Sequence, residues 1–147
     1  MKSQDCNLIF VYGTLREDLS YEFSHFLAPN ASPVGEAVVR GRLFDLGSYP
    51  GMALSDTPGE LVRGELYEID RDRLQAVLPL LDEYEGCGPS DATPHEYRRE
   101  LVEVCTHTGA TVKAWAYVLN RPTDDLEPID SGDYVEWLAS HRSASLA

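Results

Sequence analysis

The chain has 147 residues, of which 43% are hydrophobic and 25% charged. This length and balance predict one globular domain, residues 1–147, with a single sizeable core, and they exclude a globally disordered chain. Because 12 Lys and Arg residues stand against 25 Asp and Glu residues, the formal net charge is −13, which disfavours binding to nucleic acid or to an anionic membrane.

The N-terminal part predicts a cytoplasmic protein that begins with a buried strand. Residues 1–7 lack the apolar stretch of a secretory signal, and no apolar run approaches the ~20 residues that span a bilayer. Residues 7–13 form a short apolar run closed by glycine, which predicts a strand followed by a tight turn. A short helix is expected over residues 17–27, before a break at residues 29–33.

Two strands separated by a loop are expected next. Residues 34–46 are rich in β-branched and small side chains suited to a strand, within which Gly41 indicates a bulge or a bend. Residues 47–51 have the composition of a turn or loop. Residues 60–69 predict another strand.

A helical region follows, and a proline interrupts it. Asp70 is the expected N-cap of an amphipathic helix that extends to about Val77. Pro79 lacks an N–H and is tolerated better in a first turn than in a helix interior. We therefore expect a second short helix, or a sharp kink, over residues 79–85, ended by Gly86.

The C-terminal half predicts a hairpin and a final helix. Residues 87–96 form a polar loop, and residues 97–106 and 111–119 are rich in β-formers on either side of a turn. Residues 120–132 are mostly loop, and residues 133–142 predict a short amphipathic helix. Several strands with few helices between them favour an α+β fold, a small mixed or antiparallel β-barrel with flanking short helices.

Cysteines and histidines give no sign of a metal site or a cofactor. The three cysteines, Cys6, Cys87 and Cys105, are widely separated, which favours free thiols in a reducing compartment. The histidines lack metal-ligand spacing, and no dinucleotide or phosphate-binding loop is present.

The turn after the first strand is a candidate binding site. Gly13 permits a backbone conformation that other residues resist, and successive N–H groups in such a turn can converge on an anion. Thr14 adds a hydroxyl donor at the same place. The turn of Tyr12, Gly13, Thr14 and Leu15 would thus supply local donors in an acidic protein, although an ordinary strand-to-loop turn has the same composition.

Glu85 stands apart in the acidic stretch of residues 81–86. It lies at the predicted C-terminus of a helix, where the negative end of the macrodipole disfavours an ionised carboxylate. Desolvation in a pocket would raise the pKa of Glu85 further, toward the range useful for proton transfer near neutral pH. Asp82 and Glu83 are expected to stay ionised on the surface, and a solvated helix face is the alternative for all three.

Tyr97 and Arg99 are candidate supporting residues. Residues two apart on a strand share one face, so the Tyr97 hydroxyl or the Arg99 guanidinium could orient a carboxylate such as Glu85. Core packing of Tyr97 and a surface ion pair of Arg99 are the alternatives.

Together these elements resemble the gamma-glutamyl cyclotransferase-like family, in particular its bacterial members. The resemblance is carried by YGTL at residues 12–15, LDEYEG at residues 81–86 and YRR at residues 97–99, with AWAYV and IDSGDY further on. It implies a compact barrel with a cavity at one end, a substrate carboxylate held by Tyr12–Leu15, and Glu85 as the catalytic glutamate. The implied reaction is release of 5-oxoproline and a free amine from a small gamma-glutamyl compound, without a cofactor.

Two other functions remain open at this point. One is cleavage of a gamma-glutamyl group from a biosynthetic intermediate, and the other is a carboxylate-binding module that retains the pocket without turnover. The loop of residues 87–96 is longer than in the shortest family members. The resemblance implies that this loop lies at the mouth of the cavity and that its length changes the shape of the mouth. Neither the oligomeric state nor the physiological substrate follows from the sequence.

Overall fold

The computed structural model describes residues 6–12, 28–46, 50–84 and 95–134, together with residues 136, 137 and 139. The sequence predictions that lie outside these residues are the helix at residues 17–27, the turn residues Gly13, Thr14 and Leu15, the catalytic candidate Glu85 with its neighbour Gly86, residues 47–49 of the first predicted loop, and residues 87–94 of the second.

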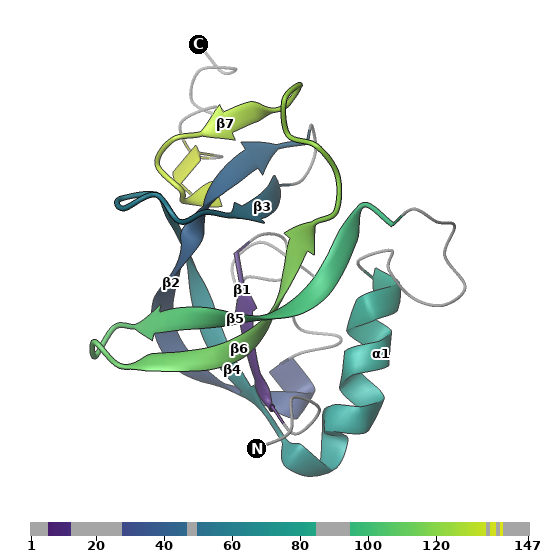
Figure 1. Cartoon of the computed structure of the whole chain (residues 1–147). Helices are drawn as coiled ribbons and strands as arrows, with labels where there is room; N and C mark the ends of the chain where they lie inside the picture. Colours follow the sequence, from purple (N-terminus) through teal and green to yellow (C-terminus); the bar gives the residue numbers. More distant parts are fainter. Residues whose placement is uncertain are drawn as a thin grey trace.

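Five strands of the described chain close into a barrel (Figure 1). They are β1 (Leu8–Val11), β2 (Ala31–Asp45), β4 (Leu61–Ile69), β5 (Tyr97–Thr106) and β6 (Thr111–Leu119). Their order is β2-β4-β1-β6-β5, and pairing of β5 with β2 completes the circle. The β1–β6 pair is parallel and the other pairs are antiparallel, so the expected small barrel, mixed or antiparallel, is confirmed and is a mixed one.

The long strand β2 belongs to two sheets. It pairs with β4 as far as Arg40, and from Gly41 onward it pairs with β3 (Pro50–Leu54). β7 (Glu127–Ile129) also pairs with this second half. A Cβ on Gly41 would lie 2.7 Å from the Ala53 carbonyl oxygen, so glycine is required where the strand changes partners. The predicted irregularity at Gly41 is therefore a change of sheet, and the shift in register lies earlier, between Pro33 and Gly35.

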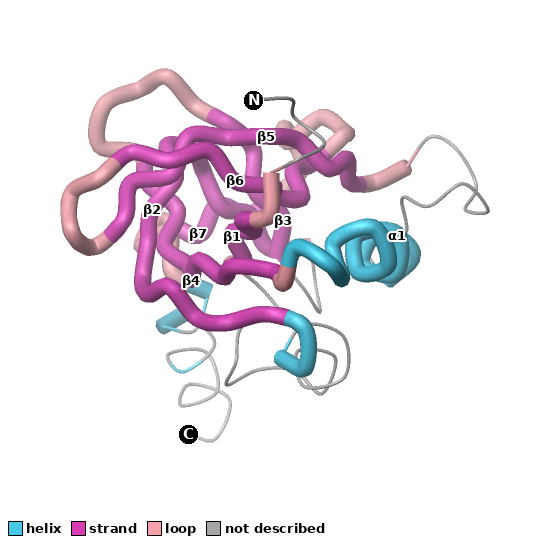
Figure 2. The backbone as a smooth tube through the Cα atoms, turned by 90° about the horizontal axis from the view of Figure 1, so that it is seen from below, coloured by secondary structure: helices cyan, strands magenta, loops and turns pink. Residues whose placement is uncertain are grey.

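Successive side chains of a strand point to opposite faces of the barrel wall, and apolar side chains on both faces create two apolar layers. On β1, Phe10 belongs to the inner layer, while Ile9 and Val11 belong to a second layer on the outside of the barrel. The helix α1 (Leu74–Tyr84) covers this outer layer (Figure 2). Among the α1 side chains that the structure describes, the buried ones are Leu74, Val77, Leu78 and Leu81.

The expectation of a separate second helix after Pro79 is wrong, because α1 continues through this residue as far as Tyr84. Pro79 removes one helical hydrogen bond, to the Gln75 carbonyl, and a proline in a helix interior costs about 3 kcal/mol. Each apolar side chain that α1 buries contributes roughly 1.5–3 kcal/mol, and four such side chains outweigh that cost. Asp70 does stand at the N-cap of the preceding 3-10 turn η4 (Arg71–Arg73), but its side chain makes no capping hydrogen bond.

Two short strands lie where loops were expected. β3 begins at Pro50, within the predicted loop of residues 47–51, and β7 lies within residues 120–132. A further 3-10 turn, η3 (Ala28–Asn30), precedes β2. Strands of three to five residues that contain proline show little of the alternating apolar pattern that predicts a strand. They form because they pair with β2.

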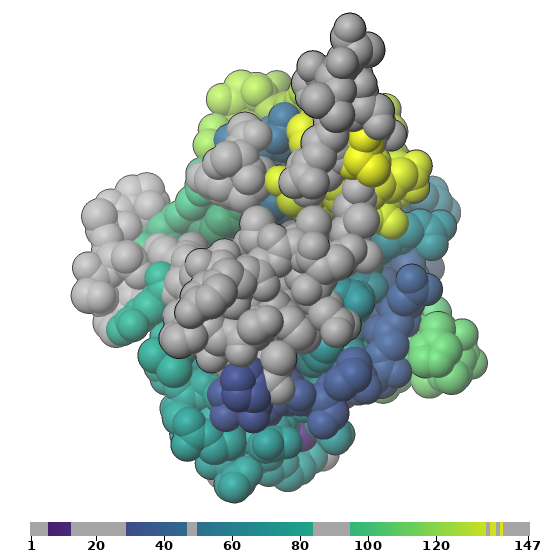
Figure 3. All heavy atoms as spheres, turned by 180° about the vertical axis from the view of Figure 1, so that it is seen from behind, coloured from purple at the N-terminus to yellow at the C-terminus, as the bar shows by residue number. Residues whose placement is uncertain are grey.

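The predicted hairpin is confirmed as β5 and β6, and the turn between them projects beside β2 (Figure 3). The C-terminal helix is confirmed where it is described: Tyr134, Glu136, Trp137 and Ala139 are helical, and the Trp137 N–H donates to the Asp133 carbonyl over 3.0 Å. In the part of the chain that the structure describes, no helix has the length and apolar character needed to cross a bilayer.

A side chain at Gly64 should disrupt the barrel interior. A Cβ there would lie 2.3 Å from the Val11 carbonyl oxygen, a backbone atom that cannot rotate away. We expect Gly64→Ala to lower the free energy of unfolding by about 3 kcal/mol, measured by urea denaturation. At Gly51 the nearest atoms belong to the Leu119 side chain, which can change rotamer, so Gly51→Ala should cost less. Equal losses would contradict this account.

Candidate functional site

The candidate site lies where several chain segments meet at one end of the barrel. Tyr12 directly follows β1, Pro50 and Met52 open β3, Tyr97 opens β5, and Asp82 belongs to the last turn of α1. Hydrogen bonds between these segments hold the region together.

Tyr12 ties the end of β1 to two other strands. Its side chain belongs to the inner layer and is 6% exposed. The hydroxyl donates to the Tyr117 carbonyl over 2.5 Å and accepts from the Met52 N–H over 3.1 Å. The position of the residue before Gly13 is therefore fixed by β3 and β6.

Tyr97 has a similar role at the start of β5. It is 6% exposed, and its hydroxyl donates to the Pro50 carbonyl over 2.5 Å. Its neighbours in the outer layer include Tyr117 and Leu119. Tyr97 is thus a buried core residue that also secures the first residue of β3.

Arg99 forms a bidentate ion pair with Asp82. Its Nε lies 2.8 Å from Oδ1 and its Nη2 lies 3.2 Å from Oδ2 of the carboxylate. The Tyr117 hydroxyl donates to the same Oδ1 over 2.8 Å. The Asp82 side chain is only 19% exposed, so the expected position on the surface is wrong for Asp82 and confirmed for the exposed Glu83.

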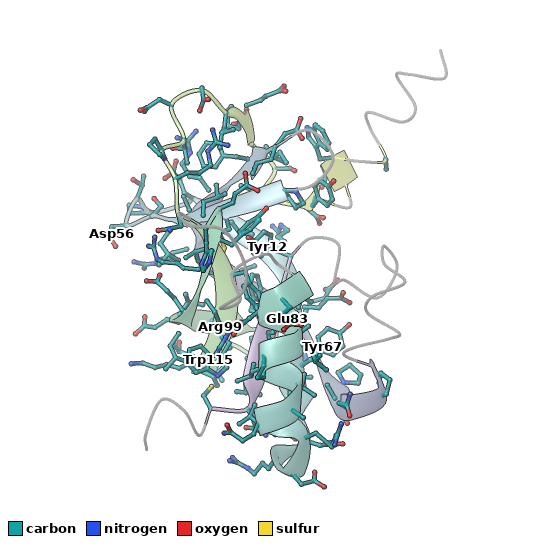
Figure 4. All side chains as sticks on the ribbon, turned by 90° about the vertical axis from the view of Figure 1, so that its right-hand side faces the viewer. Tyr12, Asp56, Tyr67, Glu83, Arg99 and Trp115 are labelled. Atoms are coloured by element: carbon teal, nitrogen blue, oxygen red, sulfur yellow. The ribbon has the colours of Figure 1, made fainter. Side chains whose placement is uncertain are left out.

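Trp115 supports the Arg99 side chain. The guanidinium carbon of Arg99 lies 4.4 Å from the centre of the Trp115 ring, within cation–π range. The indole N–H of Trp115 donates to the Cys6 carbonyl over 2.9 Å. Figure 4 shows Arg99 and Trp115 next to each other beside α1. The guanidinium is therefore held between a carboxylate and an aromatic face.

These contacts join into one network. The Met52 N–H donates to Tyr12, Tyr12 donates to the Tyr117 carbonyl, and the Tyr117 hydroxyl donates to Asp82. The network links Tyr12, the first residue of the predicted turn, to Asp82, which lies three residues before Glu85 in the sequence. Among the described residues, no group of three or more potential metal ligands gathers at this place or elsewhere.

Tyr117 was missed by sequence reasoning, although a signal for it existed. In the β5–β6 hairpin, Arg99 is directly opposite Tyr117 and Leu101 is opposite Trp115. The predicted hairpin, with residues 107–110 as its turn, brings this end of the second strand to Arg99, but it pairs Arg99 with Val118 and so misses the observed register by one residue.

Comparison with known proteins shows which family this chain belongs to. The family model described as gamma-glutamyl cyclotransferase, AIG2-like, matches residues 9–136. The chain belongs to this family. The gamma-glutamylcyclotransferase family protein YtfP of Escherichia coli K12 is 38% identical over 130 residues, which cover 87% of this chain and 96% of YtfP. Family membership confirms the resemblance seen in the sequence and supports a gamma-glutamyl cyclotransferase-like function.

Several solved structures share the fold. YkqA from Bacillus subtilis superimposes with a TM-score of 0.71 at 28% identity, over 94% of this chain and 43% of YkqA, so this chain spans less than half of that protein. The solution structure of YtfP from Escherichia coli gives a TM-score of 0.59 at 36% identity, over 88% of this chain and 97% of that one. An AIG2-like protein from Mus musculus matches with a TM-score of 0.66 at 24% identity, a similarity of fold.

Removing the Tyr12 hydroxyl should destabilise this cyclotransferase-family barrel. Tyr12→Phe leaves the buried Met52 N–H without its hydroxyl partner, and an unsatisfied buried group costs about 1–3 kcal/mol. Tyr97→Phe deprives the Pro50 carbonyl of a donor and leaves no backbone N–H of β3 unsatisfied by that loss, so we expect a smaller loss for it. Urea unfolding of both variants measures the difference. A Tyr12→Phe variant as stable as the wild type would show that the hydroxyl does not anchor β1.

Proposed function

We propose that the protein is a cofactor-independent gamma-glutamyl cyclotransferase that releases 5-oxoproline and a free amine from a small gamma-glutamyl compound. The observation that carries the proposal is the family match over residues 9–136, because it spans both the Tyr12–Leu15 turn and Glu85. The hydrogen-bonded network that links Tyr12 to Asp82 supports it, since it ties together the two segments that lead into these elements.

The reaction joins two groups of one substrate molecule. The α-amine attacks the γ-carbonyl carbon, a new C–N bond closes the five-membered ring, and the bond to the departing amine breaks. Glu85 takes a proton from the α-ammonium group and delivers a proton to the departing amine. Correct positioning in an intramolecular reaction contributes about 7–11 kcal/mol to lowering the barrier, and general acid–base catalysis adds about 10²–10⁴-fold.

The Tyr12–Leu15 turn binds the α-carboxylate of the substrate in this proposal. A net charge of −13 makes the protein as a whole repel an anion, so the binding donors have to be local. The Tyr12 hydroxyl already bonds to backbone groups of β3 and β6. Its role is therefore to hold the end of β1, and the carboxylate is bound by backbone N–H groups and the Thr14 hydroxyl.

Replacing Glu85 tests the catalytic assignment. Glu85→Gln should abolish 5-oxoproline formation while thermal unfolding and substrate binding stay as in the wild type, because the amide keeps the shape and cannot take up the proton. The exposed neighbour Glu83 provides the matched control, and Glu83→Gln should retain full activity. Full activity of Glu85→Gln would contradict the assignment.

The substrate panel tests the function itself. It consists of gamma-glutamyl amines, gamma-glutamyl amino acids and glutathione, with 5-oxoproline measured by chromatography and binding measured by calorimetry. Product from at least one class is the expected result. Binding without product would replace the proposal by a carboxylate-binding module, and release of glutamate in place of 5-oxoproline would replace it by gamma-glutamyl hydrolysis.

A further inference from the structure

We propose that Asp82, Arg99 and Tyr117 form a positioning clamp that sets the last turn of α1 relative to the end of β1. The clamp would determine how accurately the proposed acid–base residue meets the substrate. This inference rests on the proposed function. None of the three is assigned a chemical step; each acts through the backbone that it holds.

The geometry of the clamp restricts Asp82 strongly. A guanidinium that donates to both carboxylate oxygens fixes the plane of the carboxylate, and the Tyr117 hydroxyl adds a third donor from the neighbouring strand. Arg99 and Tyr117 are directly opposite each other in the β5–β6 ladder. The last turn of α1 is thus joined to two strands whose relative positions the barrel already fixes.

Pro79 explains why this turn needs its own attachment. The proline removes the helical hydrogen bond to Gln75 in the middle of α1. The first turn of α1 is held by the buried Leu74 and Val77. Beyond the proline, Leu81 is fully buried and Asp82 carries the polar contacts. The clamp therefore lies on the side of the proline from which the chain continues to Glu85.

The environment of the pair distinguishes it from an ordinary surface ion pair. The Arg99 and Asp82 side chains are 22% and 19% exposed, and the Trp115 ring covers the guanidinium. The neighbouring Arg98 pairs with Glu100 over 2.9 Å, with both side chains more exposed, at 49% and 35%. Exposed pairs contribute little to stability or geometry, so Arg98 is a matched control on the same strand.

Tyr117 makes the clamp more than a local contact. Its hydroxyl donates to Asp82, while its carbonyl accepts from the Tyr12 hydroxyl. One residue therefore contacts both the last turn of α1 and Tyr12, the first residue of the predicted anion-binding turn. A shift at either end would change the separation between the proposed acid–base residue and the proposed carboxylate anchor.

Steady-state kinetics on the substrate identified by the panel test the clamp. Tyr117→Phe and Arg99→Lys should lower kcat by about 10–100-fold with KM within about two-fold, because a misplacement near 1 Å costs about that much. Arg99→Lys keeps the charge and loses the bidentate geometry. Arg98→Lys should leave kcat unchanged. Unchanged kcat in both clamp variants would overturn the inference while leaving the proposed function intact.

A double-mutant cycle separates positioning from general destabilisation. If Asp82 and Tyr117 act as a unit, Asp82→Asn combined with Tyr117→Phe should lower kcat little more than either change alone. Independent effects would multiply, and that result would contradict a shared clamp. Tyr117→Phe, which retains the ring in the core, carries the test if Asp82→Asn does not fold.

Hydrogen exchange tests the clamp without any turnover. In Tyr117→Phe, the amides of residues 80–84 should exchange at least about tenfold faster than in the wild type, while those nearer the first turn of α1 stay protected. Arg98→Lys should change neither region. Unchanged exchange at residues 80–84 would overturn the clamp. Absence of product from the wild-type protein, with the expected exchange pattern, would instead overturn the proposed function alone.

Discussion

Closure of the barrel by β2 is the constraint on which the rest of the structure depends. This strand pairs with β4 and β5 in its first half and with β3 and β7 in its second. Because the closed barrel fixes which face of each strand points inward, it also creates the outer apolar layer that α1 covers. The candidate site lies where that layer meets β3, and its polar groups come from segments that barrel closure brings together.

The site region shows how an acidic chain arranges polar groups without many cations. The Tyr12 and Tyr97 hydroxyls bond to backbone groups, and the partly buried Arg99 is matched by Asp82. These bonds fix the ends of strands and the end of a helix. At such ends the chain changes direction, and the backbone hydrogen bonds of regular secondary structure restrain its position least. Family membership gives this arrangement a functional context, since the match to the cyclotransferase family extends across the same segments.

Asp82 illustrates a limit of reading charge from sequence. In the stretch of residues 81–86 the carboxylates look alike, and a helical pattern predicts only which of them share a face. Asp82 is partly buried because Arg99 and Tyr117 face it from the hairpin, whereas Glu83 points to solvent. The partner of a charged side chain is a long-range property, so an isolated acidic run does not reveal it.

The sequence by itself determined a small barrel, the β5–β6 hairpin, the strand at residues 60–69 and the family, because alternation, turn composition and motif order are local. That the barrel is mixed was decided by the parallel pairing of β1 with β6. It did not determine β3, β7 or the continuation of α1 through Pro79. Those features depend on pairing with β2 and on burial against the barrel, which only the folded chain supplies. The Tyr12–Leu15 turn and Glu85 were chosen from the sequence. The tertiary structure added Tyr117, whose partners lie 35 and 105 residues away along the chain.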